Sequence, residues 1–208
     1  MFSIIQAAGW PIWPLIACSV IALAIVLERF AMLRTAKVAP ANLVSEVLSV
    51  TAQTLPAPSV IAQLGSSSPL GSVMASGLAT LQQHPHSTED DLRAALESSG
   101  RRAIHALDKH LPTLATIASI APLLGLLGTV IGMIEIFGAQ PTGGAGSNPA
   151  QLAHGISVAL YNTAFGLIVA IPCLVFWRYF RQRVETLQLV LESGADRLLR
   201  HLSTLRAP

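Results

Sequence analysis

Three long apolar stretches, separated by charged or turn-forming segments, dominate the pattern along this 208-residue chain. They run from about Trp10 to Leu33, from Leu111 to Phe137 and from Leu152 to Trp177. About 20 mostly apolar residues are enough for a helix to cross a bilayer, so each stretch predicts a transmembrane helix. The first stretch lacks a basic leader and a small-residue cleavage site, and we therefore expect a retained anchor.

Two further helical patterns adjoin the second and third spans. A Ser/Thr pair at 87–88 is followed by three acidic residues and then by apolar residues at helical spacing, which predicts a helix that runs directly into the second span. Beyond the third span, one face repeats apolar residues, namely Leu187, Leu191, Ala195, Leu198, Leu202 and Leu205. This pattern predicts a helical tail that packs against other helices, rather than a freely solvated one.

Composition places the chain among membrane proteins. Hydrophobic residues make up 52% of the chain and charged residues 12%, about half the charged share of a soluble domain. The mean hydropathy is +0.58. Cys18 and Cys173 lie inside apolar runs without metal or redox spacing, so we interpret them as small core residues.

The basic residues indicate the orientation. Of the 13 Lys and Arg residues, 12 lie either between the first two spans or after the third, and Arg29 lies near the C-terminal end of the first span. The positive-inside rule therefore places the N-terminus and the loop between spans two and three outside, and the C-terminus inside. Aromatic residues near the span ends, among them Trp10, Trp13 and Trp177, suit the two interfacial belts.

These patterns predict an all-α membrane protein with three transmembrane helices, of which the second and third extend inward beyond the membrane. The expected segments are a short outer N-terminus (1–9), the first span (10–33), an inner helical segment (34–110), the second span (111–137), an outer loop (138–151), the third span (152–177) and an inner C-terminal helix (178–208).

Polar residues inside the second and third spans are the candidates for function. Glu135 interrupts the stretch "SIAPLLGLLGTVIGMIEIFG", and a carboxylate in hydrocarbon is rarely retained without a partner or a role. Thr129 and Thr163 fall near the membrane midplane of their spans, where they either face a shared surface or bond to their own helices. The candidates for close helix packing are Gly125, Gly128, Gly132 and Gly166.

Other kinds of site find little support. The six histidines show no ligand spacing, so no metal or other cofactor is expected. The glycine-rich outer loop lacks the strand and the Lys-Ser/Thr of a phosphate cradle. The sequence shows no motif that combines a nucleophile, a general base and a group to orient the base, so an enzyme is not expected. The basic residues fit topology and contact with membrane lipids rather than nucleic-acid binding.

The chain resembles the ExbB/TolQ/MotA family of proton-channel proteins, and within it the ExbB branch. The resemblance rests on "GWPIWPLIACSVIALAIVLERF", "APLLGLLGTVIGMIEIF" and "ISVALYNTAFGLIVAIPCLVFWRYF", and it covers all three spans in order. It implies a homo-oligomer, a pentamer in the family, in a bacterial inner membrane, with the outer side periplasmic and the inner side cytoplasmic. The second and third spans are then expected to line a pore that holds single-span helices of an ExbD-like partner bearing an aspartate.

The resemblance also implies roles for individual residues. Thr129 and Thr163 match the pore-lining threonines of the family, whereas Val158 stands where the family often has a glutamate. Glu135 lies about 120° around its helix from Thr129. It either supplies the missing acid from the neighbouring helix or is a hydrogen-bonded carboxylate near the outer mouth.

The expected function is a motor or channel subunit, driven by the proton-motive force, that with its ExbD-like partner energises a TonB-like protein for import across the outer membrane. Two alternatives remain open. One is a TolQ-like subunit of an envelope-integrity motor, and the other is a passive three-span scaffold for a membrane complex. A MotA-like subunit fits less well, because its chains have four spans and a larger charged inner domain.

Overall fold

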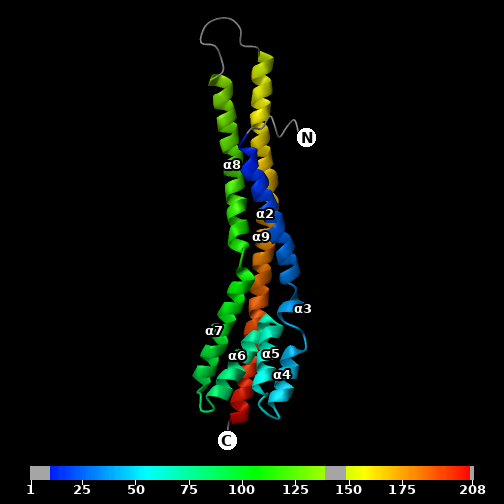
Figure 1. Ribbon diagram of the computed structural model, residues 1–208, viewed down its shortest axis with the longest axis vertical. Helices are drawn as coiled ribbons and strands as arrows, with labels where there is room; N and C mark the ends of the chain where they lie inside the picture. The colour runs from blue at the N-terminus through cyan, green and yellow to red at the C-terminus, as the bar shows by residue number, and fades with distance from the viewer. Residues whose placement is uncertain (1–9, 139–148, 207–208) are drawn as a thin grey trace. The chain divides into compact units, whose positions relative to one another are not determined.

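A computed structural model describes residues 10–138 and 149–206, and every regular element in these two ranges is a helix (Figure 1). Three helical stretches are long and apolar enough to cross a membrane. The all-α class and the three long apolar helices are thus confirmed. The predicted outer segment 1–9 and most of the predicted loop 138–151 lie outside the described residues. The helices are α2 (Ile12–Met32), α3 (Thr35–Val38), α4 (Leu43–Thr51), α5 (Pro58–Ser67), α6 (Pro69–Gln83), α7 (Glu89–Asp108), α8 (Leu111–Gly138) and α9 (Pro149–Arg206).

The chain forms two compact units, which are described separately. The first, here called the apolar unit, comprises residues 1–27 and 110–179. The second, called the charged unit, comprises residues 28–109 and 180–208. The apolar unit therefore holds most of α2, all of α8 and the first part of α9. The charged unit holds α3 to α7 and the rest of α9.

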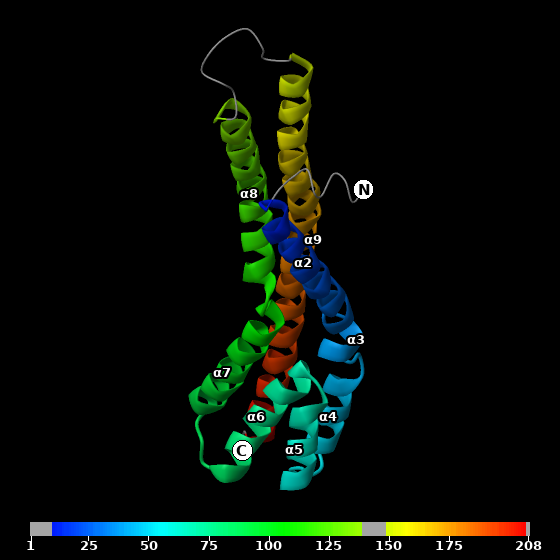
Figure 2. The same ribbon diagram turned by 45° about the horizontal axis from the view of Figure 1, so that its top comes forward.

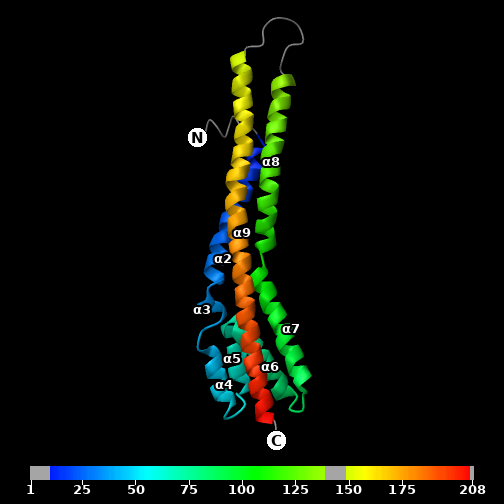
Figure 3. The same cartoon turned by 180° about the vertical axis from the view of Figure 1, so that it is seen from behind.

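The apolar unit packs α2, α8 and α9 around small residues. Leu15, Ala121 and Ala170, one from each helix, are buried together, and α8 and α9 run side by side when seen from the front and from behind (Figures 1 and 3). Many large apolar side chains of the same helices stay exposed, including Leu123, Ile134 and Ile168. Water is a poor environment for so much apolar surface, so lipid or other protein chains must cover it.

In the charged unit, α6 is the central helix. It packs against α5 and α7 (Figure 2), and its Leu70, Met74 and Leu78 are completely buried or nearly so. The Ser76 hydroxyl donates to the Ala95 carbonyl oxygen at 2.8 Å, which ties α6 to α7. The C-terminal part of α9 buries most of the predicted apolar face, with Leu187, Leu191, Leu198 and Leu202 inside the unit and Ala195 half-buried. The prediction is wrong for Leu205, which lies in the last turn of the helix and is 51% exposed.

The start of α7 follows the sequence prediction. Thr88 is the N-cap, and its hydroxyl accepts from the Asp91 backbone N–H while the Asp91 carboxylate accepts from the Thr88 N–H, a reciprocal capping box. The backbone hydrogen bond from Thr88, followed by the one from its hydroxyl, holds the pKa of Asp91 below its usual 3.8. The ionised carboxylate thus fixes the first turn of the helix.

The predicted direct run of this helix into the second span is wrong. Helix α7 ends at Asp108 and α8 begins at Leu111, so two residues interrupt the helix. Lys109 has an extended ψ of 136°, and His110 has a φ of 71°, a left-handed conformation that is uncommon outside glycine. The His110 carbonyl oxygen accepts the Leu114 N–H and so opens α8. By contrast, the predicted extension of the third span is one continuous helix to Arg206.

Candidate functional site between α8 and α9

Glycines let α8 and α9 approach until backbone touches backbone. A Cβ atom on Gly125 would lie 2.7 Å from the Asn162 carbonyl oxygen and 3.0 Å from the Thr163 Cα. On Gly166 it would lie 2.6 Å from the Ala121 carbonyl oxygen. Since real Cβ contacts are longer than this, any side chain at these two positions would push the helices apart.

The remaining two predicted packing glycines lie along the same contact. A Cβ on Gly128 would collide with the Asn162 side chain, and one on Gly132 would lie 3.1 Å from the Ala159 Cβ. Later residues of α8 contact earlier residues of α9: Gly125 lies against Thr163, and Gly132 lies against Ala159. The two helices are therefore antiparallel. On α8, Ala121, Gly125, Gly128 and Gly132 recur at steps of four, three and four, and with Gly166 of α9 they form one continuous seam.

Thr129 lies beside this seam, at the edge of an open hollow on α8. The hollow has a volume of about 610 Å³ and is lined by Thr129, Val130, Met133, Ile134, Phe137 and Gly138. The Thr129 hydroxyl donates to the Leu126 carbonyl oxygen of its own helix at 2.6 Å. That bond uses the hydroxyl hydrogen but leaves oxygen lone pairs that a donor in the hollow can reach.

Thr163 lies one helical turn further along the seam. Its Cα packs against Gly125, whereas Thr129 follows Gly128, the partner of Asn162. Four residues at 1.5 Å each separate the two levels by about 6 Å along the helix axis. Both threonines are half-buried, and the Thr163 hydroxyl makes no hydrogen bond within residues 10–138 and 149–206.

Asn162 is a polar residue of the seam that the sequence reasoning left out of the site. Its side chain is 2% exposed and lies against Gly128. A buried amide between two apolar helices is costly unless it is hydrogen-bonded, which marks the position as important to the helix pair. The signal in the sequence was the run of polar residues Tyr161, Asn162 and Thr163, of which only the last was assigned a role.

Glu135 does not line the hollow beside Thr129. It is exposed on α8, and the hollow is formed instead by the residues on either side of it. Val158, the position where the family often has an acid, is half-buried. In a single chain, therefore, the structure does not bring Glu135 onto the face of Thr129.

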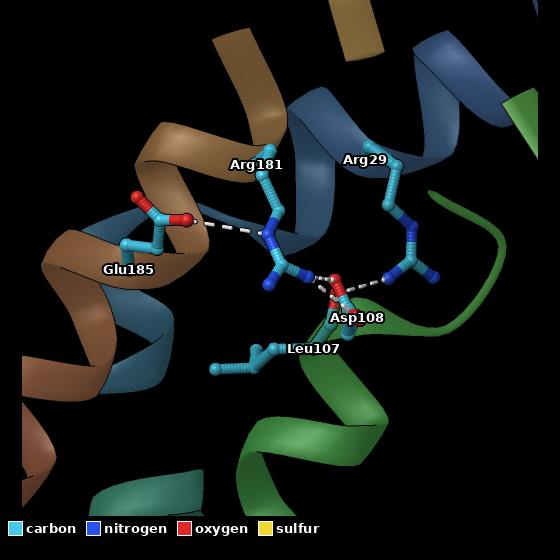
Figure 4. Close-up of polar contacts among 5 residues, drawn as sticks. All are labelled: Arg29, Leu107, Asp108, Arg181 and Glu185. Atoms are coloured by element: carbon cyan, nitrogen blue, oxygen red, sulfur yellow. Dashed lines mark hydrogen bonds and ion pairs between the residues drawn. The ribbon is translucent and has the colours of Figure 1, made fainter. Parts of the chain in front are cut away.

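A second polar cluster lies in the charged unit, where α2, α7 and α9 meet (Figure 4). Arg29 is buried, and its guanidinium donates to the Leu107 carbonyl oxygen at 3.0 Å and to the Glu28 carboxylate at 2.8 Å. It thereby satisfies a carbonyl at the C-terminal end of α7. The Arg29 Nε is also buried and has no hydrogen-bond partner among the described residues.

Arg181 continues this cluster from α9. Its Nη1 lies 3.2 Å from both carboxylate oxygens of Asp108, the last residue of α7, and its Nε contacts Glu185 at 3.2 Å (Figure 4). The two arginines thus hold adjacent residues of the same helix end. This arrangement fixes the C-terminal end of α7 immediately before the break at Lys109 and His110.

Comparison with known proteins decides the family. The model of the MotA/TolQ/ExbB proton channel family matches residues 65–193, which include all of α8 and every candidate site residue. The chain belongs to this family. It is 30% identical over 177 residues to putative biopolymer transport protein ExbB-like 3 of Synechocystis, covering 85% of this chain and 82% of that protein.

Two further members of the family are similar over most of the chain. Biopolymer transport protein exbB1 of Vibrio cholerae is 31% identical over 177 residues, 81% of this chain and 74% of that protein. Putative biopolymer transport protein ExbB-like 1 of Synechocystis is 33% identical over 172 residues, 82% of this chain and 66% of that protein. The resemblance to the ExbB branch is therefore confirmed over most of the chain.

Proposed function

We propose that this member of the proton channel family is an ExbB-like motor subunit, in which the seam between α8 and α9 faces a central pore. The single observation that carries the proposal is the Thr129 hydroxyl at the edge of an open, otherwise apolar hollow on α8. A polar group in a membrane span is tolerated where it faces protein or a water-filled space. A pore occupied by a partner helix supplies such a space.

Neutral hydroxyls suit contact with an aspartate that gains and loses a proton. Thr163 offers a donor or an acceptor as the carboxyl changes state, whereas Thr129 offers an acceptor and becomes a donor when its hydroxyl turns away from the Leu126 carbonyl oxygen. A fixed charge beside that aspartate would instead shift its pKa and favour one state. Glu135, exposed and off the hollow, takes a tuning role near the outer mouth in this proposal.

The wider assembly follows from the same proposal. The chain forms a homo-oligomer, most simply a pentamer, in the bacterial inner membrane with its N-terminus outside. An ExbD-like single-span protein sits in the pore, and proton flow drives movement that reaches a TonB-like protein. Two relatives that are named as biopolymer transport proteins of the ExbB type support this reading over the TolQ-like one.

The proposal is tested in cells by measuring the import across the outer membrane that requires the ExbD-like partner. We expect Thr129→Val and Thr163→Val each to abolish import, because valine keeps the volume of threonine but removes the hydroxyl, and Glu135→Gln to lower it only in part. Thr116→Val is the matched control. The Thr116 hydroxyl makes a similar bond to its own helix, to the Pro112 carbonyl oxygen at 2.9 Å, but Thr116 lies outside the hollow.

Pull-down of the complex separates function from assembly. All variants should still recover the partner, because the seam glycines are unchanged. Full import by the Thr129→Val, Thr163→Val double variant means that the chain is a scaffold. Complete loss with Glu135→Gln means that the carboxylate, not the hydroxyl pair, is the decisive group.

A further inference from the structure

A pocket in the charged unit is lined by small and basic residues. It has a volume of about 720 Å³ and lies where α3, the α5–α6 corner and α7 meet. Lys37, Ser68 and Ser72 line it. Helix α7 contributes Ser99, Arg102, Ala103 and Ala106, which recur at steps of three, one and three and so lie on a single face of that helix.

The charge in this pocket is uncompensated. Lys37 and Arg102 are its only charged lining residues, and neither has an ion pair within the described part of the chain. Arg102 donates only to the Ser98 hydroxyl, at 3.0 Å. Their neighbours behave differently, since Arg93 pairs with Glu89 and Arg101 pairs with Glu97. Two cations with no acid between them attract an anion.

Hydroxyl groups add donors beside the two cations. The Ser68 side chain is buried, with 8% of the residue exposed, and its oxygen accepts the Gly71 N–H at 3.0 Å. Within the described residues, the hydroxyl hydrogens of Ser68 and Ser72 have no acceptor. The pocket therefore holds donors that the protein itself leaves unused.

The geometry of the α5–α6 corner is held tightly. A Cβ on Gly71 would collide with the Leu64 carbonyl oxygen and lie 2.7 Å from the Ser67 hydroxyl. On the opposite side, the Ser99 hydroxyl donates to the Ser72 carbonyl oxygen at 3.2 Å, which joins α7 to α6. Ser68 and Ser99 are thus held by packing and hydrogen bonds before any ligand arrives, whereas Lys37 and Arg102 are exposed residues of the lining.

From these observations we propose that the pocket binds the phosphate group of a phosphate ester. Phosphoryl oxygens accept several hydrogen bonds at once, which matches a lining that contains a lysine, an arginine and serine hydroxyls. The lining has no aromatic side chain to stack on a base, so a small ester such as glycerol phosphate fits better than a nucleotide. Such a group comes either from a soluble metabolite or from a lipid headgroup, and Lys37 lies only five residues after the end of α2.

Calorimetry with the full-length protein in a neutral detergent tests the proposal. The soluble probes are inorganic phosphate and glycerol 3-phosphate. The lipid probe is short-chain phosphatidylglycerol, with short-chain diacylglycerol as the phosphate-free control. Saturable binding of either soluble probe identifies a soluble ligand, and saturable binding of phosphatidylglycerol alone identifies a lipid headgroup.

A charge-matched pair of variants shows whether the pocket is responsible. The Lys37→Gln, Arg102→Gln double variant should bind the active probe at least tenfold more weakly than the native chain. The Arg34→Gln, Arg101→Gln double variant removes the same charge from outside the pocket and should stay within twofold. Equal weakening in the two double variants, or no saturable binding of any phosphate probe, overturns the proposal.

A third variant keeps the test sound if the loss of both cations disturbs folding. Ala36 is exposed and lines the pocket, so Ala36→Glu adds a carboxylate with both cations in place. The proposal predicts weaker phosphate binding with an unchanged thermal midpoint. Native affinity in Ala36→Glu contradicts it.

Discussion

At the scale of single residues, the glycines of the seam differ in what surrounds them. Gly125 faces the backbone of α9, which cannot move aside without displacing the whole helix. Gly132 faces only the Ala159 side chain at 3.1 Å, and Gly100 in α7 has nothing within 4 Å. Replacing these glycines is therefore expected to change the free energy of unfolding by different amounts, although they look alike in the sequence.

Gly125→Ala should lower the thermal midpoint of the protein in detergent, because the added methyl group overlaps the Asn162 carbonyl oxygen. Overpacking of this kind typically costs about 1–3 kcal/mol. Gly100→Ala is the control and should raise stability by about 0.5–1 kcal/mol, since it removes a glycine from an open position inside a helix. A Gly125→Ala protein as stable as the native chain would show that α8 and α9 are not in backbone contact.

The sequence predicted these residues to different extents. Spacing pointed to close helix packing at Gly128 and Gly132, and Gly125 and Gly166 were added as further small residues of the same two spans. It could not reveal the buried position of Asn162, which depends on the register of α9 against α8. The position of Glu135 off the hollow is likewise a property of helix rotation, and the 120° estimate from the sequence pointed the same way.

At the scale of elements, the break between α7 and α8 is the feature that the sequence did not predict. No glycine follows the end of α7, but Pro112, the second residue of α8, is a local signal for a new helix start that the sequence reasoning did not use. The helix end is also held from other parts of the chain, by Arg29 on Leu107 and by Arg181 on Asp108. Contacts between residues more than 70 positions apart leave no local signal.

Arg29→Met should destabilise the charged unit by about 1–3 kcal/mol, because a buried carbonyl of Leu107 loses its donor while the apolar volume is kept. The matched variant is Arg183→Met. It removes an arginine of α9 that donates to the Thr35 hydroxyl at the surface, and should cost less than about 1 kcal/mol. Thermal unfolding in detergent measures both, and a larger loss with Arg183→Met would contradict the assigned role of Arg29.

At the scale of the whole molecule, the exposed apolar faces of the three long helices agree with the composition. Hydrophobic length and the one-sided distribution of Lys and Arg were sufficient to predict three spans and an orientation. The family followed from the order of the spans and the residues around the two threonines, and the match over residues 65–193 confirms it. Assembly with other chains belongs to the proposed function.

Accessibility to a membrane-impermeant thiol reagent tests the orientation. In a Cys18→Ala, Cys173→Ala background, a cysteine replacing Gly144 should react in intact cells whose outer membrane admits the reagent. A cysteine replacing Ser67 should react only after lysis, because all Lys and Arg residues lie on its side of the membrane. Reversed labelling would place the N-terminus inside and invert the direction of proton entry.

Proton flux into sealed vesicles tests the central claim most directly. Vesicles hold the chain with its single-span partner, and a pH-sensitive dye reports influx under an imposed potential, which supplies about 2.3 kcal/mol per proton at 100 mV. The account predicts partner-dependent influx that falls to the partner-free level in the Thr129→Val, Thr163→Val variant and persists in Thr116→Val. Equal influx with and without the two hydroxyls would contradict it.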